Sequence, residues 1–268
     1  MILEILKLSI ILMLSLVGIY FVFGYIYQII ESKSNYYLTK TFGVNGLLVT
    51  GIGTVVHELS HYLMCKMFNH RVTEVKLFRP FKFKYDGILG YVRYSYDKKS
   101  LFQRIGNFFS GIAPMIGGSI FIIVVSILLF PTLYSNLNIS IDMSEPIDIL
   151  KVTVENIEVF YNTIFNLENI KNIKFWAFIY LITSISIHMS LSTADLENAK
   201  EGLLYIFIAS ILVNVVFYIL NISILKIFNY ILLYNSIVFS VLVFGLIFSI
   251  IGLFITYIAY KIKEFVCC

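Results

Sequence analysis

Charged residues are scarce in this chain of 268 residues: they make up 13%, whereas hydrophobic residues make up 59% and the mean hydropathy is +0.88. This composition is far from that of a soluble domain and predicts a polytopic membrane protein. Cysteine is also rare, since only Cys65, Cys267 and Cys268 occur, so a disulfide framework is excluded. The chain contains no internal repeat, glycine-rich phosphate loop or serine nucleophile elbow.

Long apolar runs replace the missing polar surface, and each predicted membrane helix needs about 20 such residues. Glu4 and Lys7 precede the first run, which has no small-residue cleavage site and is therefore expected to be a retained helix. The fold class predicted is an all-α polytopic membrane protein with about six transmembrane helices. The predicted spans are residues 5–30, 43–67, 105–131, 174–194, 203–226 and 233–260.

Charge asymmetry predicts the orientation of these spans. Residues 66–104 hold ten basic and three acidic residues, which is typical of a cytoplasmic loop. The charged residues within 134–173 are mostly acidic, and the alternation of the spans places this segment outside. A turn is expected at 142–146 and an amphipathic helix at 147–165. Both termini are then expected in the cytoplasm. The net charge of +4 reflects this bias, so we expect contact with the lipid bilayer and no nucleic acid.

A small β-hairpin is predicted on the cytoplasmic side, within residues 71–97. Residues 72–78 and 90–96 alternate in type with period two, and Pro80 and Asp86-Gly87 separate them. An exposed strand edge near the second span would suit an extended substrate segment. A hairpin that only rests on the membrane surface is the alternative interpretation.

The strongest functional signal is the HExxH motif of His57, Glu58 and His61, which lies inside a predicted span. On a helix, positions four apart share one face, so both imidazoles can bind one metal ion. Glu58 is the candidate general base beside them. The alternative is an accidental match, but ionisable groups inside a span cost roughly 2.5–3.5 kcal/mol each and are rare without a function.

Asp195 is the candidate third ligand, because it stands at the inner end of the fourth predicted span. It also fits a helix cap, together with Ser192. His188 is a candidate ligand, oxyanion-stabilising donor or neighbour of a ligand, and a packed histidine is equally consistent. Glu197 and Glu201 are rival third ligands that would form a solvated face otherwise.

Other polar or conformationally special residues near the motif have weaker assignments. Asn107 is a candidate for holding a substrate carbonyl or an oxyanion, or for bonding another helix. Pro114 is expected to kink the third span and free a carbonyl. His70 is interpreted as a surface residue, and Cys65 as a packing residue.

These features resemble the site-2 protease family of intramembrane zinc metalloproteases, over roughly residues 45–200. The resemblance rests on HExxH in one span, on Gly111 and Pro114 in the next and on Asp195 at the end of the following one. It implies zinc bound by His57, His61 and Asp195, with Glu58 as general base. The family usually has glycine after this aspartate, whereas Leu196 follows it here.

The sequence thus predicts an integral membrane zinc endopeptidase that cleaves membrane-embedded or membrane-adjacent protein substrates with a zinc-activated water. The domains expected are an N-terminal helix with an outer loop (1–41), a metalloprotease core (42–200) and two C-terminal helices (201–268). A prokaryotic cytoplasmic membrane is the expected location. Two alternatives stay open: a non-proteolytic scaffold or transporter-associated protein, and an HtpX-like protease with a glutamate ligand.

Overall fold

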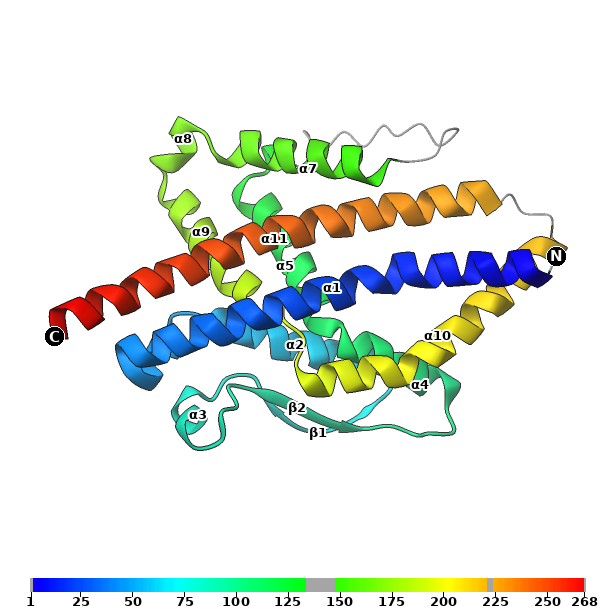
Figure 1. Cartoon of the computed structure of the whole chain (residues 1–268), viewed down its shortest axis with the longest axis horizontal. Coiled ribbons are helices and arrows are strands. Elements are labelled where there is room, and N and C mark those ends of the chain that lie inside the picture. The colour runs from blue at the N-terminus through cyan, green and yellow to red at the C-terminus, as the bar shows by residue number, and fades with distance from the viewer. Residues whose placement is uncertain (1, 134–147, 221–223, 268) are drawn as a thin grey trace.

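A computed structural model describes residues 2–133, 148–220 and 224–267, and these form a mostly helical molecule with one two-stranded sheet (Figure 1). The elements in chain order are α1 (Ile2–Phe42), the 3₁₀ helix η1 (Gly43–Leu48), α2 (Gly51–Met67), β1 (Arg71–Lys76), α3 (Pro80–Asp86), β2 (Tyr91–Ser95), α4 (Leu101–Gly111), α5 (Ala113–Leu129), α7 (Ile149–Ile164), α8 (Leu167–Ile170), α9 (Ile173–Ile187), α10 (Thr193–Ile219) and α11 (Ile224–Cys267).

The two longest helices, α1 and α11, pack along each other and run in the same direction (Figure 1). Tyr27 donates its hydroxyl proton to the Leu242 carbonyl at 2.8 Å, and Lys263 donates to the Thr41 carbonyl at 2.8 Å. The residue numbers of the partners thus increase in the same direction along both helices. The N- and C-terminal ends of the chain therefore lie at opposite ends of the molecule. The location of both termini in the cytoplasm stays a prediction.

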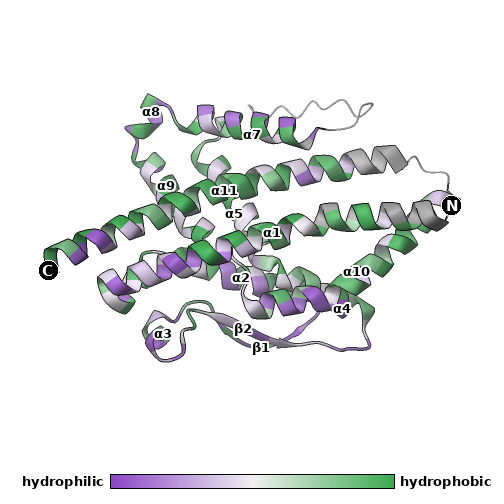
Figure 2. Ribbon diagram, viewed as in Figure 1, coloured by the Kyte–Doolittle hydropathy of each residue, from purple (hydrophilic) through white to green (hydrophobic). Residues whose placement is uncertain are grey.

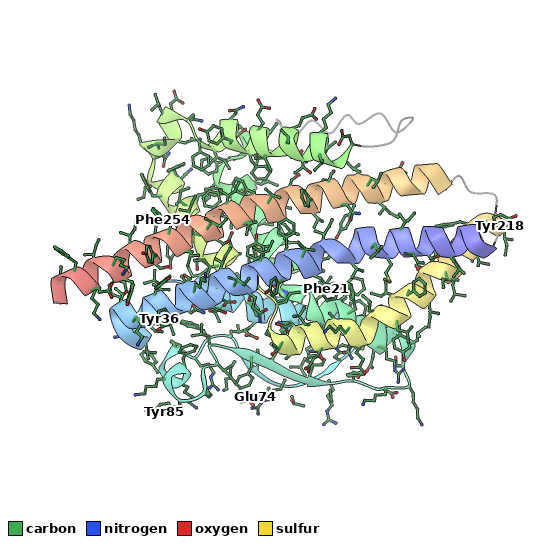
Figure 3. The ribbon with its side chains drawn as sticks, viewed as in Figure 1. Phe21, Tyr36, Glu74, Tyr85, Tyr218 and Phe254 are labelled. Atoms are coloured by element: carbon green, nitrogen blue, oxygen red, sulfur yellow. The ribbon has the colours of Figure 1, made fainter. Side chains whose placement is uncertain are left out.

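The described helices are long and apolar enough for an integral membrane protein, but six spans are not confirmed. Two segments are each long and apolar enough to cross a membrane alone, Thr193–Ile219 and Tyr230–Val266. Up to four spans result if two bent helix pairs each count as one span. Hydrophobic residues cover much of α1, α10 and α11 (Figure 2). Exposed apolar side chains such as Phe254 of α11 project from the outer surface, as lipid contact requires (Figure 3).

Breaks in the backbone explain the difference from the predicted spans. The first run continues as helix to Phe42, so the outer loop expected before residue 41 is helical, and a 64° bend then separates it from α2. The third run bends by 62° between α4 and α5. Pro114 lies in the first turn of α5, directly after this bend, where its missing N–H costs no helical hydrogen bond, so the kink expected in the third span is present at this position.

The fourth predicted span ends early, because α9 stops at Ile187 and is too short to cross a bilayer alone. Residues 188–192 follow without helix, and Ser192 then caps α10. Asp195 therefore belongs to the first turn of α10, not to the end of the preceding span. The domain boundary predicted at residues 200 and 201 also falls inside α10.

The predicted strand pair is present: β1 and β2 are antiparallel, with Val75 opposite Val92. The connection is not a simple turn, since it contains α3, which ends at Gly87 with φ +70°. The sheet lies on one side of the helices, and α7 and α8 lie on the other (Figure 1). The helix expected at 147–165 is confirmed as α7, whereas the turn expected at 142–146 lies outside the described residues.

Candidate metal centre

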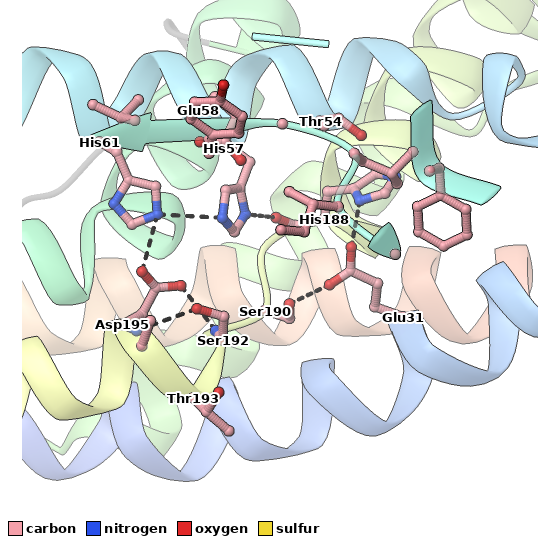
Figure 4. Close-up of a pocket in the computed structure, with 18 of the residues that line it drawn as sticks. Glu31, Thr54, His57, Glu58, His61, His188, Ser190, Ser192, Thr193 and Asp195 are labelled. Carbon is pink, nitrogen blue, oxygen red and sulfur yellow. Dashed lines mark hydrogen bonds and ion pairs between the residues drawn. The ribbon is translucent and has the colours of Figure 1, made fainter. Parts of the chain in front are cut away.

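The structure brings the three predicted metal ligands together. His57 and His61 lie one turn apart on α2, and their Nε2 atoms are 3.2 Å apart. The Oδ1 atom of Asp195, from α10, lies 3.3 Å from His61 Nε2. All three ligand atoms lie within 4.8 Å of one another (Figure 4). Two helices that are far apart in the sequence thus converge on one point.

Backbone carbonyls fix both imidazole rings. His57 Nδ1–H donates to the His188 carbonyl at 2.8 Å, and His61 Nδ1–H donates to the Ser110 carbonyl at 2.9 Å. Because a carbonyl can only accept, the proton of each neutral ring must be on Nδ1. Each Nε2 therefore presents a lone pair to the centre, which is the usual arrangement for a metal-binding histidine.

Asp195 is both a cap and a candidate ligand, so the two interpretations of this residue are compatible. Its Oδ2 accepts the Ser192 N–H at 2.8 Å, and its own N–H donates to Ser192 Oγ at 3.2 Å, which forms a capping box at the start of α10. The cap uses one carboxylate oxygen. It leaves Oδ1 directed at His61, so the sequence signal that favours a cap also orients the ligand.

The three converging atoms are all acceptors, and this arrangement tests whether a cation fits. Without a proton or a cation between them, the two Nε2 lone pairs and the Asp195 carboxylate repel one another at these distances. Tetrahedral zinc with Zn–N bonds of 2.0–2.1 Å places its ligand atoms about 3.3 Å apart. The observed separations of 3.2 and 3.3 Å are close to this value. The residues present fit zinc.

A cavity of about 530 Å³ opens beside these ligands, and no lysine or arginine is among its described lining residues. Glu58 lines it and is largely buried, and its carboxylate accepts no hydrogen bond from the described part of the chain. Gly90 lies against Glu58, since a Cβ atom there would lie 2.6 Å from Glu58 Cγ. The stretch from Gly87 to Val92 thus forms one wall of the cavity, next to the candidate base.

His188 is a neighbour of a candidate ligand, which is one of the roles that the sequence left open. Its carbonyl holds His57, whereas its ring Nδ1–H donates to Glu31 Oε1 of α1 at 2.6 Å. Glu31 Oε2 accepts a hydrogen bond from the Ser190 hydroxyl (Figure 4). Neither Glu31 nor Ser190 was among the predicted site residues. The sequence feature that could have pointed to Glu31 is its position directly after the first apolar run, residues 5–30.

Asn107 and Pro114 are buried, but neither is among the described residues that line the cavity. Asn107 Nδ2 donates to Glu201 Oε2 at 3.3 Å, so it joins α4 to α10 and matches the interhelical alternative. Glu201 also accepts a hydrogen bond from Tyr96. The cluster of possible ligands found in the described residues includes neither Glu197 nor Glu201, so the geometry favours Asp195.

The interpretation of His70 as a surface residue is wrong. Only 4% of His70 is exposed, its Nε2–H donates to the Gln103 carbonyl at 2.8 Å, and its ring stacks on Tyr94 with centroids 5.0 Å apart. Burial lowers the pKa of His70, although the bond to the Gln103 carbonyl partly opposes the effect. Cys65 is fully buried beside Ser110, as a packing residue should be.

Comparison with known proteins adds no relative to this geometry. No protein-family model matches the chain, and no curated protein and no solved structure matches it.

Proposed function

We propose that this chain is an integral membrane zinc metallopeptidase in which His57, His61 and Asp195 bind the ion and Glu58 is the general base. The observation that carries the proposal is the convergence of three acceptor atoms within 4.8 Å of one another, with two separations of 3.2 and 3.3 Å and with both rings fixed through Nδ1. The resemblance of the motifs to those of site-2 proteases supports the same assignment. Zinc in such a site polarises a carbonyl and lowers the pKa of a water that it binds.

Glu58 is suited to proton transfer by its position. It follows His57 directly, it lines the cavity, and no described protein donor occupies its carboxylate. It can therefore accept a proton from the attacking water and deliver it to the leaving amine. The ring of His57 and the carboxylate of Asp195 stay fixed during this transfer, because backbone groups hold both.

The substrate class proposed is a peptide segment in extended form, at or near the membrane surface. A helical segment shields its amides with internal hydrogen bonds, so it must unwind before hydrolysis. The backbone at Gly87 to Val92, which leads into β2, borders the cavity and can pair with an unwound segment by strand addition. This gives the hairpin a role beyond resting on the membrane surface.

The first test combines zinc analysis with cleavage in detergent-purified protein. We expect about one zinc ion per chain in the parent, and strong loss in His57→Ala and Asp195→Ala. Glu58→Gln should keep its zinc and lose about 10²–10⁴-fold in the cleavage rate of a transmembrane peptide library, because only the base is removed. Glu168→Gln is the matched control, since Glu168 is an exposed carboxylate of α8.

Four outcomes would contradict the proposal. A parent that stays free of zinc after reconstitution would exclude the metal site. Full cleavage by Glu58→Gln would exclude the proposed base. Zinc loss in Glu197→Gln or Glu201→Gln, with zinc retained in Asp195→Ala, would support a glutamate ligand in place of Asp195. A parent that binds zinc but cuts no member of the library would favour a non-proteolytic membrane protein.

A further inference from the structure

The connection between α9 and α10, residues 188–192, supports the metal centre at two points. At its start, the His188 carbonyl accepts the Nδ1–H of His57. At its end, the N–H and hydroxyl of Ser192 form the capping box with Asp195. A shift of this connection would therefore move one ligand on α2 and one on α10 together.

Glu31 of α1 holds the start and the middle of the same connection, one with each of its carboxylate oxygens. Oε1 accepts from the His188 ring at 2.6 Å, and Oε2 accepts from the Ser190 hydroxyl. The His188 side chain is only 2% exposed and that of Glu31 is 21% exposed, so water competes weakly for these bonds. Figure 4 shows Glu31 across from this connection, at the opposite end of the pocket from His61 and Asp195.

The location of Glu31 makes an incidental role unfavourable. A carboxylate among apolar helices costs roughly 2.5–3.5 kcal/mol on insertion scales, and such residues are usually retained for a function. No lysine or arginine lines the cavity to offset this charge, and the two bonds to the connection are its observed hydrogen bonds among the described residues. Its interactions are therefore directed at the connection that fixes the ligands.

We propose that Glu31 is a positioning residue of the metal centre: through His188 and Ser190 it fixes residues 188–192, and thereby the ring of His57 and the carboxylate of Asp195. This inference rests on the proposed zinc site. The hydrogen bonds of Glu31 within the described part of the chain go to His188 and Ser190 and not to a ligand side chain, so it acts through other residues. Groups that orient metal ligands in this way typically change metal affinity by 10–100-fold when they are removed.

The experiment is a zinc titration against a competing chromophoric chelator. Glu31→Ala and His188→Ala should each raise the Kd for zinc by about 10–100-fold. The Kd of the double variant should exceed that of the weaker-binding single variant by no more than about threefold, because both substitutions break the same link. Lys33→Gln, at an exposed position on the same helix and with a charge change of equal size and opposite sign, should stay within about threefold of the parent. Glu31→Leu fills the position without a hydrogen-bonding atom and serves if Glu31→Ala does not fold.

A second measurement avoids the metal. In zinc-stripped protein, the amides of residues 188–195 should exchange hydrogen faster in Glu31→Ala and Glu31→Leu than in the parent and Lys33→Gln. Unchanged exchange together with unchanged zinc affinity in the Glu31 variants would overturn the inference. If the parent itself binds no zinc, the proposed function fails, and the exchange measurement still decides whether Glu31 fixes the connection.

Discussion

Every histidine of this chain has one ring nitrogen fixed by a protein acceptor, and the surroundings of the other nitrogen separate their roles. His57 and His61 donate to carbonyls and turn Nε2 toward each other and toward Asp195. His70 donates to a carbonyl and His188 to a carboxylate, and the second nitrogen of each is buried without a hydrogen-bond partner. Only the α2 pair thus shares lone pairs at one point, which is what a metal ion requires.

His70 should make the stability of the protein depend on pH. Burial lowers its pKa, so the folded state keeps it neutral where the unfolded state, with a pKa of about 6.5, becomes protonated. As the pH falls through about 6.5, the unfolded state binds more protons and the free energy of unfolding decreases. The stabilising contribution is therefore complete above this pH and is lost below it.

The measurement is thermal unfolding of zinc-stripped protein at about pH 7.5 and about pH 5.5. His70→Phe can keep the stacking on Tyr94 but cannot titrate, so its Tm should fall less than that of the parent. Equal decreases in both proteins would show that His70 contributes nothing to the pH dependence. The other histidines are the same in both proteins and cancel in the comparison.

For single residues, the sequence predicts those features of the site that depend on residues close together in the chain. The spacing of His57 and His61 fixes a shared helix face, and a serine followed three residues later by Asp195 marks a helix start. Glu31 could not be assigned, because its partner His188 is 157 positions away and comes close only through packing. The burial of His70 likewise depends on distant chain segments.

At the scale of elements, the close packing of α4 against α10 sets the position of the third ligand. A Cβ atom on Gly111 would lie 2.6 Å from the Ala199 backbone nitrogen and closer still to the Asp195 carbonyl. A Cβ atom on Gly202 would lie 2.5 Å from the Phe108 nitrogen. Small residues at both positions allow the two backbones to approach, as is typical of helix pairs in membranes.

Gly111→Ala should therefore destabilise the protein and weaken zinc binding. The added methyl group meets backbone atoms, which cannot rotate away, so α10 and Asp195 must shift at a cost of about 1–3 kcal/mol. Thermal unfolding and zinc titration measure the two effects. Gly18→Ala is the matched control, because nothing lies within 4 Å of its Cβ position on α1, and it should be neutral or stabilising by up to about 1 kcal/mol. Equal behaviour of the two variants would contradict the packing argument.

Helix ends were harder to predict than helix existence. The apolar runs do form helices, but hydropathy cannot locate a break whose residues are themselves apolar. Ile112, at the bend between α4 and α5, is 1% exposed, and Met189 and Leu191 of the connection are equally buried. The backbone groups of such breaks are satisfied by distant partners, such as the ring of His57 at the His188 carbonyl.

At the scale of the whole molecule, two peripheral layers flank the helices. The strands and α3 lie on one side, and α7 and α8 lie on the other (Figure 1). The segment that contains the strands is the basic one, with ten basic and three acidic residues over 66–104. Sequence analysis expected this segment and residues 134–173 on opposite sides, and their described parts do flank opposite sides of the helices (Figure 1). The parallel course of α1 and α11 could not be predicted, because it depends on contacts between residues more than 200 positions apart.

The charge pattern predicts that the strand layer faces the cytoplasm and that α8 faces the opposite side. Two single-cysteine proteins test it, with Lys98→Cys in the loop after β2 and Glu168→Cys in α8, both at exposed positions, in a background in which the native cysteines are alanine. In intact bacterial cells a membrane-impermeant maleimide should label Glu168→Cys and spare Lys98→Cys until the cells are permeabilised. The reverse pattern would invert the orientation. Labelling of both proteins in intact cells would place both layers outside the cell. The membrane crossings would then have to come from helices such as α10 and α11, which are long and apolar enough to span alone.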